Sequence, residues 1–409
     1  MAHSEIIAGL DIGTTKTCCV LAEVDLDTET IDIIGVGMAP SDGLKKGVVV
    51  DLEAATASIQ LATSKAQQMA GSVSLRSVWV GVTGEHISSL NSRGVVAITS
   101  SDREVTDSDV DRAIEQSKVI VLPPDREIVQ SIPRGYVVDG QDSVHDPVGM
   151  SAGRLEVETH IITGSTSFLD NVTKCVERAG FAVEGRVFEP IATAEAAVFP
   201  AEKDLGVALA DIGGGTTDIA VFINGDIFHS AVLPIGGQFV TRDIAMGLRT
   251  AQYEAERTKI AYGCASSDMV DVDEIFTITT IGETQIRELP REILVGIIEP
   301  RMQEILQMIK AELMRSGKLD LLPAGVVLTG GGAQMPGTAE LAQQVLELPV
   351  RIGRPEGVRG LNDTVETPMH ATAVGLVRYA AKNHAIWHDE QKASTIKHGL
   401  KAWISRWFK

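Results

Sequence analysis

Two short stretches of the chain carry acidic, glycine and threonine residues in the same order. One runs from Asp11 to Lys16 (DIGTTK), and the other runs from Asp211 to Asp218 (DIGGGTTD). Each lies between two apolar runs, which predicts an acidic residue at the end of a buried strand and a tight turn into the next strand. Two such turns can enclose one phosphate tail, so the repeat predicts a two-lobed protein that binds ATP.

The residue types in these turns suit phosphate and Mg²⁺. Glycines let backbone N–H groups approach a phosphate closely, threonine hydroxyls add donors, and Lys16 would add a positive charge. Asp11 and Asp211, one from each predicted lobe, could hold Mg²⁺ through water, because Mg²⁺ keeps several waters and takes few protein carboxylates. The predicted nucleotide-binding residues of the turns are Gly13, Thr14, Thr15, Lys16, Gly213, Gly214, Gly215, Thr216 and Thr217.

Two further segments belong to the same predicted site. The glycine cluster Gly330, Gly331 and Gly332 follows a buried run and suits the passage of backbone close to an adenosine. Glu189 opens a run of small residues typical of a tightly packed helix, and it could orient a water molecule at the γ-phosphate. A carboxylate favoured by the helix dipole explains Glu189 equally well. Glu189 and Asp211 are therefore the candidate catalytic residues.

The elements that must position these residues occur twice. Strands are expected at 6–12, 16–24 and 30–39, followed by a helix at 51–70 and a strand at 78–82. A similar order follows the second turn, and a segment of different character, 85–163, separates the halves. This pattern predicts a duplicated α/β unit with an inserted α+β domain. The elements expected in the second half are strands at 205–211, 217–223, 226–234 and 326–328, and helical sequence at 238–262 and 295–316.

Composition limits the function further. The net charge of −19 over 409 residues argues against a nucleic-acid partner, because phosphate neutralisation needs clustered Lys and Arg. The four cysteines show no C-x-x-C spacing, which favours buried free thiols in a reducing compartment. Neither a signal peptide nor a membrane-spanning run is recognisable, so we expect a cytosolic protein unless something tethers it.

The C-terminal end has the composition of a tether. A polar stretch at 382–395 predicts a linker, and 396–409 predicts a short basic amphipathic helix that lies on anionic membrane lipid. Docking of that helix on the protein's own core or on a partner is the alternative. A single tether would bind reversibly, whereas a filament would bind far more tightly through many tethers. The predicted membrane residues are Ile396, Leu400, Trp403, Ile404, Trp407 and Phe408 on one face, flanked by Lys397 and Lys401.

The order of these segments carries a family resemblance. The two turns, the helix from Glu189, the glycine cluster at 330–337 and the small-residue run at 372–380 resemble the actin, heat-shock-chaperone and sugar-kinase superfamily. Within it, essentially the whole chain resembles the FtsA family of bacterial division actin homologues. The resemblance implies actin-like (ribonuclease H-like) ATPase lobes. The implied subdomains are 1A (1–84, 164–203 and 368–381), 1C (85–163), 2A (204–234 and 301–367) and 2B (235–300).

The resemblance also implies partners and a location. Subdomain 2B would receive the C-terminal peptide of the tubulin-like division GTPase FtsZ, with Arg301 at that groove, although a solvated helix-start charge explains Arg301 too. Subdomain 1C would contact neighbouring protomers of a head-to-tail filament and later division proteins. Glu256 and Lys259 would contact ribose and adenine, or else form only an i,i+3 surface pair. The protein would tether FtsZ to the cytoplasmic face of the membrane at the division site, with at most weak ATPase activity.

Two other functions remain open at this level. A pilus-assembly actin homologue resembling PilM would share an insertion like 1C, without the terminal helix. A small-molecule kinase of the same superfamily would need a substrate-reading set of polar residues between the lobes, which the sequence does not reveal.

Overall fold

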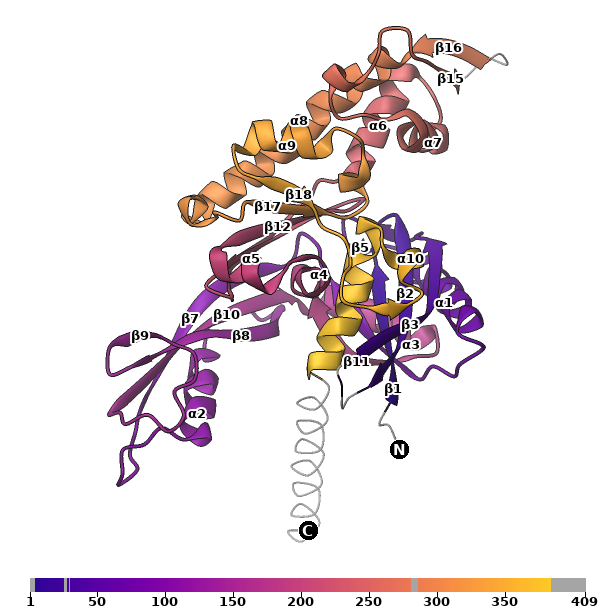
Figure 1. The fold of residues 1–409 in the computed structure, drawn as a ribbon. Coiled ribbons are helices and arrows are strands. Elements are labelled where there is room, and N and C mark those ends of the chain that lie inside the picture. Colours follow the sequence, from indigo (N-terminus) through magenta and orange to yellow (C-terminus); the bar gives the residue numbers. More distant parts are fainter. Residues whose placement is uncertain (1–3, 26–27, 29, 281–285, 384–409) are drawn as a thin grey trace.

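The chain folds into two lobes with an arm, as Figure 1 shows. A computed structural model describes residues 4–25, 28, 30–280 and 286–383. The predicted linker and terminal helix therefore lie almost wholly outside the described residues, which reach only residue 383. In this described part, no helix is long and apolar enough to cross a membrane.

The first lobe is built on a six-stranded sheet of order β11-β6-β1-β2-β3-β19. Strand β1 pairs antiparallel with β2 and parallel with β6. Helices α1 (Leu52–Met69) and α3 (Thr166–Arg178) pack on one face, and α4 (Glu189–Ala197) and the helical residues 371–383 cover the other. The strands are β1 (Ser4–Ile12), β2 (Lys16–Asp25), β3 (Thr30–Pro40), β6 (Ser77–Val82), β11 (Ala182–Phe188) and β19 (Arg359–Gly360).

The second lobe repeats this plan with a five-stranded sheet of order β14-β13-β12-β17-β18. Again the first strand pairs antiparallel with the second, and parallel with a later strand. Helices α6 (Gly237–Leu248), α8 (Arg291–Arg315) and α9 (Thr338–Leu346) pack on the face away from the first lobe. The strands are β12 (Val207–Ile212), β13 (Thr217–Ile223), β14 (Asp226–Leu233), β17 (Val326–Thr329) and β18 (Val350–Ile352). The predicted duplicated α/β architecture is confirmed.

The segment between the lobes forms the arm of Figure 1. Its four strands have the order β7-β10-β8-β9, and α2 (Asp107–Ser117) packs on them through Ala113 and its neighbours. The arm is thus an α+β unit. The edge strand β7 lies beside β14 of the second lobe. The strands of the arm are β7 (Ser88–Ala97), β8 (Arg126–Val138), β9 (Gln141–Val144) and β10 (Arg154–Ser165).

The structure refines two helical predictions. The helical sequence expected at 238–262 consists of two helices, because α6 ends at Leu248 and α7 (Gln252–Tyr262) begins after it. Arg249 adopts a left-handed backbone (φ 51°), which ends a helix, and the Thr250 hydroxyl donates to the Thr279 carbonyl at 2.6 Å. Helix α8 begins at Arg291 rather than 295, directly after the hairpin of β15 (Ile275–Thr279) and β16 (Ile286–Pro290).

Short elements complete the described chain. All four cysteines are free and buried, as predicted. The short elements are β4 (Leu44–Lys45), β5 (Val48–Val49), α5 (Pro200–Leu205), α10 (Asn362–Val365) and 3-10 turns at Ser267–Met269, Leu319–Leu321, Gly332–Gln334 and Pro368–His370.

Candidate functional site

A cavity of about 510 Å³ lies between the two lobes, and both glycine-threonine turns line it. Each turn connects the first two strands of its sheet, at the strand ends that face the other lobe. Both turns therefore reach the cavity. The third glycine cluster and residues of α7 and α8 also line it. A cavity of this size suits a nucleotide-sized ligand.

The two turns have the same backbone geometry. The Gly13 N–H donates to the Lys16 carbonyl at 3.0 Å, and the Gly213 N–H donates to the Thr216 carbonyl at 2.9 Å. The registers match as well, since Asp11 pairs with Cys18 and Asp211 pairs with Asp218. Equal loop closures at equal positions show that the two turns are the same structural unit.

The turns also touch each other across the cavity. A Cβ atom on Gly214 would lie 2.4 Å from Cγ2 of Thr15, and one on Gly215 would lie 2.5 Å from Oγ1 of Thr14. A side chain at either position would require the threonine opposite it, or the lobes, to shift. The glycines of the second turn are therefore required by the threonines of the first.

Lys16 lies in an ion pair within its own turn. Its ammonium is 2.6 Å from Oδ2 of Asp11, whose side chain is buried. Burial lowers the pKa of Lys16, but Asp11, Cys18 and Asp211 together outweigh it and keep that pKa above its ordinary value. The lysine is thus fully charged at the floor of the cavity.

Three more carboxyl groups gather near this pair. Thr372 and Thr193 donate to Oδ2 of Asp211 at 3.0 and 3.4 Å, and Thr83 donates to Oδ1 of Asp218 at 2.8 Å. Glu189 at the start of α4 is the third carboxyl group. All three are buried.

Crowding of these carboxyl groups changes their protonation. Burial and the Asp11 charge raise the pKa of Asp211 to about 6, and burial and the Asp211 charge raise the pKa of Asp218 to about 8. Burial, followed by the charges of Asp11 and Asp218, raises the pKa of Glu189 well above its ordinary value. Lys16 alone does not neutralise four carboxyl groups, so the site fits a cation. Among the described residues, no three His, Cys, Asp or Glu side chains form a ready metal cluster.

The third glycine cluster contacts the second turn directly. Gly330 has a positive φ of 84°, and a Cβ there would lie 2.1 Å from Oδ1 of Asp211. Gly331 and Gly332 follow it in the cavity wall. A larger residue at 330 would displace the carboxylate that the cavity presents.

Glu256 and Lys259 both line the cavity, on helix α7. The Lys259 ammonium lies 2.7 Å from the Glu256 carboxylate and 2.9 Å from the Thr241 hydroxyl. It also donates to the Gly237 carbonyl at 3.2 Å. The i,i+3 pair is therefore part of the cavity wall and is tied to the N-terminal turn of α6.

One predicted nucleotide-binding residue does not line this cavity, and Arg301, predicted for another site, lies elsewhere. Thr217 is fully buried, and its hydroxyl donates to the Ile235 carbonyl at 2.8 Å. Arg301 lies in α8, where its guanidinium pairs with Asp243 at 2.5 Å and also with Glu304. Sequence reasoning assigned no role to Thr83, Thr372 or Asp218, although Asp218 ends the second turn.

Solved structures of other proteins define the class of this fold. The PilM-PilN type IV pilus biogenesis complex matches with a TM-score of 0.67 and 17% identity, over 92% of this chain and 98% of the matched chain. MreB5 of Spiroplasma citri, solved with bound ADP, matches with a TM-score of 0.52 and 16% identity, over 95% and 98%. At such identities the likeness concerns the fold alone, which is that of the actin-like ATPases.

Sequence comparisons define the family within that class. The model of the family "Cell division protein FtsA" matches residues 208–375, and the model "SHS2 domain inserted in FTSA" matches residues 84–163. FtsA of Pseudomonas aeruginosa is 43% identical over 98% of this chain and 97% of its own length. FtsA of Bacillus subtilis is 44% identical (94% and 86%), and that of Escherichia coli K12 is 37% identical (98% and 96%). The chain belongs to the FtsA family of actin-like cell-division proteins.

Proposed function

We propose that this protein binds ATP·Mg²⁺ between its lobes, assembles into head-to-tail filaments and tethers FtsZ to the cytoplasmic face of the membrane at the division site. One observation carries the nucleotide part: two turns of the same backbone geometry, from separate lobes, face each other in one cavity that also holds a half-buried lysine and four buried carboxyl groups. Solved relatives of the same fold carry ADP or AMPPNP, which supports the same ligand here.

The turns would act as two halves of a phosphate clamp. Backbone N–H groups of Gly13 and Gly213 to Gly215, with the hydroxyls of Thr14, Thr15 and Thr216, would donate to the phosphates, and Lys16 would move from Asp11 to them. Asp11 and Asp211 would hold Mg²⁺ through water. When bound, the metal would neutralise charge on the phosphates and on the carboxyl cluster. Gly330 to Gly332, Glu256 and Lys259 would contact the nucleoside.

The same electrostatics support slow hydrolysis. A general base must be ionised to accept a proton, and burial keeps Glu189 protonated above its ordinary range. Glu189 would position water only after a cation lowers that pKa. ATP would thus serve mainly to close the lobes for assembly, with Asp211 as the residue that couples the two lobes to the metal.

Subdomain 2B is the proposed site for the FtsZ tail peptide. Apolar side chains lie exposed on this region, among them Met246, Tyr253 and Ile275, and such surfaces mark partner sites. Arg301, on α8, has its charge already paired to Asp243 of α6. An acidic tail would therefore have to exchange with Asp243 and Glu304. The arm, 85–163, would contact neighbouring protomers and later division proteins.

Vesicle co-sedimentation tests the tether and the adaptor role together. We expect the full chain with Mg·ATP to sediment with anionic vesicles and to carry labelled FtsZ tail peptide. Trp403→Glu should release it, because a charge on the apolar face opposes burial in the membrane interface. Trp387→Glu, in the proposed linker, is the matched control and should sediment normally. Equal sedimentation of both variants would refute the helix as anchor, and sedimentation without peptide would refute the adaptor role.

A further inference from the structure

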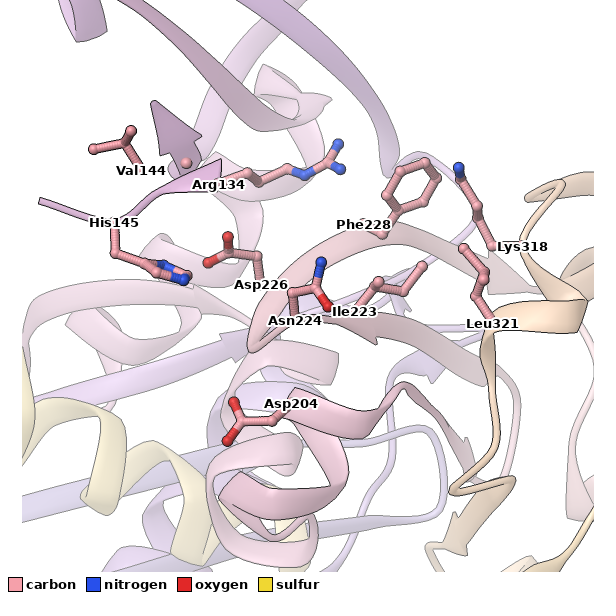
Figure 2. A pocket seen from close by; sticks show the side chains of 11 residues that line it. Arg134, Val144, His145, Asp204, Ile223, Asn224, Asp226, Phe228, Lys318 and Leu321 are labelled. Atoms are coloured by element: carbon pink, nitrogen blue, oxygen red, sulfur yellow. The ribbon is translucent and has the colours of Figure 1, made fainter. Parts of the chain in front are cut away.

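A second cavity, of about 700 Å³, lies where the arm meets the second lobe, and it shares no lining residue with the nucleotide site. Figure 2 shows the side chains that line it. Arg134 and His145 come from the arm, and the second lobe supplies its residues from α5, the β13–β14 turn, β14 and the turn after α8. Neither the turns nor the glycine cluster of the nucleotide site contributes to it.

Two positive charges lie at one end of this cavity, against a single aromatic ring. The guanidinium carbon of Arg134 is 4.3 Å from the centre of the Phe228 ring, and the ammonium of Lys318 is 4.7 Å from it. Figure 2 shows the two cationic groups on either side of that ring. The arm and the lobe thus each present one cation at the same place.

Arg134 is incompletely satisfied at this place. Its side chain is only 10% exposed, and its Nε and Nη1 atoms have no hydrogen-bond partner. Its Nη1 forms only a long ion pair with Glu158, at 3.6 Å, and burial lowers the pKa of Arg134 from its ordinary value. Lys318 forms no ion pair with any residue that the structure describes. Buried donors without partners are rare in folded proteins, and they favour a bound anion.

The other end of the cavity has the opposite character. Asp226, Asp204 and Asn224 line it, and Figure 2 shows His145 directed toward Asp226. Burial raises the pKa of Asp226 to about 6, against the opposing charges of His145 and Arg134. Asp226 forms no hydrogen bond or ion pair with Arg134 in the described structure, so the Nε and Nη1 donors of Arg134 remain without an acceptor. Acceptors at this end favour a ligand that also carries donors, and they disfavour a polyanion.

We propose that this cleft binds a small anionic ligand whose phosphate or carboxylate group lies between Arg134 and Lys318, with hydroxyl or amine groups toward Asp226 and Asp204. The volume suits a metabolite-sized molecule, and Ile223 and Leu321 supply apolar wall between the two ends. The bound anion joins the arm to the second lobe. It therefore restrains the arm relative to the second lobe, whereas none of the described residues that line the nucleotide cavity belongs to the arm.

Hydrogen exchange of the full chain, measured by mass spectrometry, tests this site because it shows which segments a bound ligand protects. The probes are glycerol 3-phosphate and malate at millimolar concentration, each compared with chloride at equal ionic strength. We expect slower exchange in peptides covering 126–138, 226–233 and 316–322. Peptides of the nucleotide turns, 12–17 and 212–217, report binding at the other cavity and keep the two sites apart.

Charge-removing variants make the test decisive. Lys318→Gln should lose the protection, and so should Arg134→Gln. Lys318→Gln is the safer variant because Lys318 is only half-buried, while Lys174→Gln, an exposed cation on α3, should retain the protection. Protection by one probe only identifies the anionic group as phosphate or carboxylate. Absence of protection with both probes, or equal protection in wild type and Lys318→Gln, overturns the site.

Discussion

The two phosphate turns have the same backbone geometry but differ in how their charges are balanced. In the first turn, Asp11 has a counter-ion built into the same turn, Lys16, at 2.6 Å. In the second turn, threonine stands at the position of that lysine, and Asp218 stands where the first has Cys18. Repetition of the fold did not repeat the electrostatics.

This difference in charge gives the two lobes different roles in binding a nucleotide. The first turn is neutral by itself and supplies a positive charge that can move to a phosphate. The second turn and Glu189 hold carboxyl groups whose pKa values are raised, which means that they lack a cation. A metal-bound nucleotide fits both needs at once, because it brings the anion to Lys16 and the cation to Asp211.

The largest expected effect comes from the carboxylate of the second turn. Asp211→Ala should abolish ATP-dependent filament assembly and weaken Mg²⁺-dependent ATP binding by at least about tenfold, the loss typical when a metal-orienting carboxylate is removed. Calorimetric titration with Mg·ATP and sedimentation of filaments measure the two effects. Asp170→Ala, an exposed acidic residue on α3, is the control. Normal affinity and normal filaments in Asp211→Ala would remove Asp211 from the metal site.

The counter-ion of the first turn should matter for stability even without nucleotide. Lys16→Gln leaves the Asp11 carboxylate buried and unpaired, which should lower the free energy of unfolding by about 2 kcal/mol. Chemical denaturation of the nucleotide-free protein measures it. The double variant Asp11→Asn/Lys16→Gln should recover most of the loss. If the single variant is as stable as wild type, the first turn is not neutralised by its own lysine.

Contact between the turns predicts a smaller loss of stability, which a second substitution should reverse. Gly215→Ala places a Cβ 2.5 Å from Oγ1 of Thr14, so either the side chain of Thr14 shifts or the lobes separate. Overpacking of this kind costs about 1–2 kcal/mol. Thr14→Gly should restore the stability of Gly215→Ala, in a double-variant cycle followed by denaturation. A purely additive cycle would show that the turns do not contact each other in solution.

The parts that sequence predicts well are those set by local chemistry. The two turns are predictable because a strand, an acidic residue and a Gly/Thr run repeat in order, and the structure gives both the same register. Thr83 and Thr372 could not be found in this way, because their hydroxyls reach the carboxylates only through tertiary packing. The break at Arg249 was missed for a similar reason, since a bond from Thr250 to the distant Thr279 accompanies it.

The same limit applies to the second cavity. Arg134, Phe228 and Lys318 lie in separate elements, and nothing in their spacing brings them together. Their meeting depends on how the arm packs against β14, which is a property of the assembled fold. The charge of each residue is readable from the sequence, whereas the unsatisfied Nε and Nη1 donors of Arg134 are not.

The smallest expected effect is a difference between the two turns in how pH changes the free energy of unfolding. Asp218 has its pKa raised from 3.8 to about 8, so between these values the folded protein keeps a proton that the unfolded chain releases. The free energy of unfolding without nucleotide should therefore fall as pH rises, by about 1 kcal/mol per pH unit for one proton.

Asp218→Asn should flatten this slope between pH 6 and 7 and keep the Thr83 hydrogen bond, because the amide oxygen can still accept it. The first turn gives the contrast: Lys16 stays charged far above this range, so the ion pair with Asp11 adds no slope there. Denaturation curves of wild type and Asp218→Asn at pH 6 and pH 7 measure this slope in each protein. An equal slope in both proteins would place the retained proton elsewhere in the cavity, on Glu189, which shares the same burial and the same neighbouring charges.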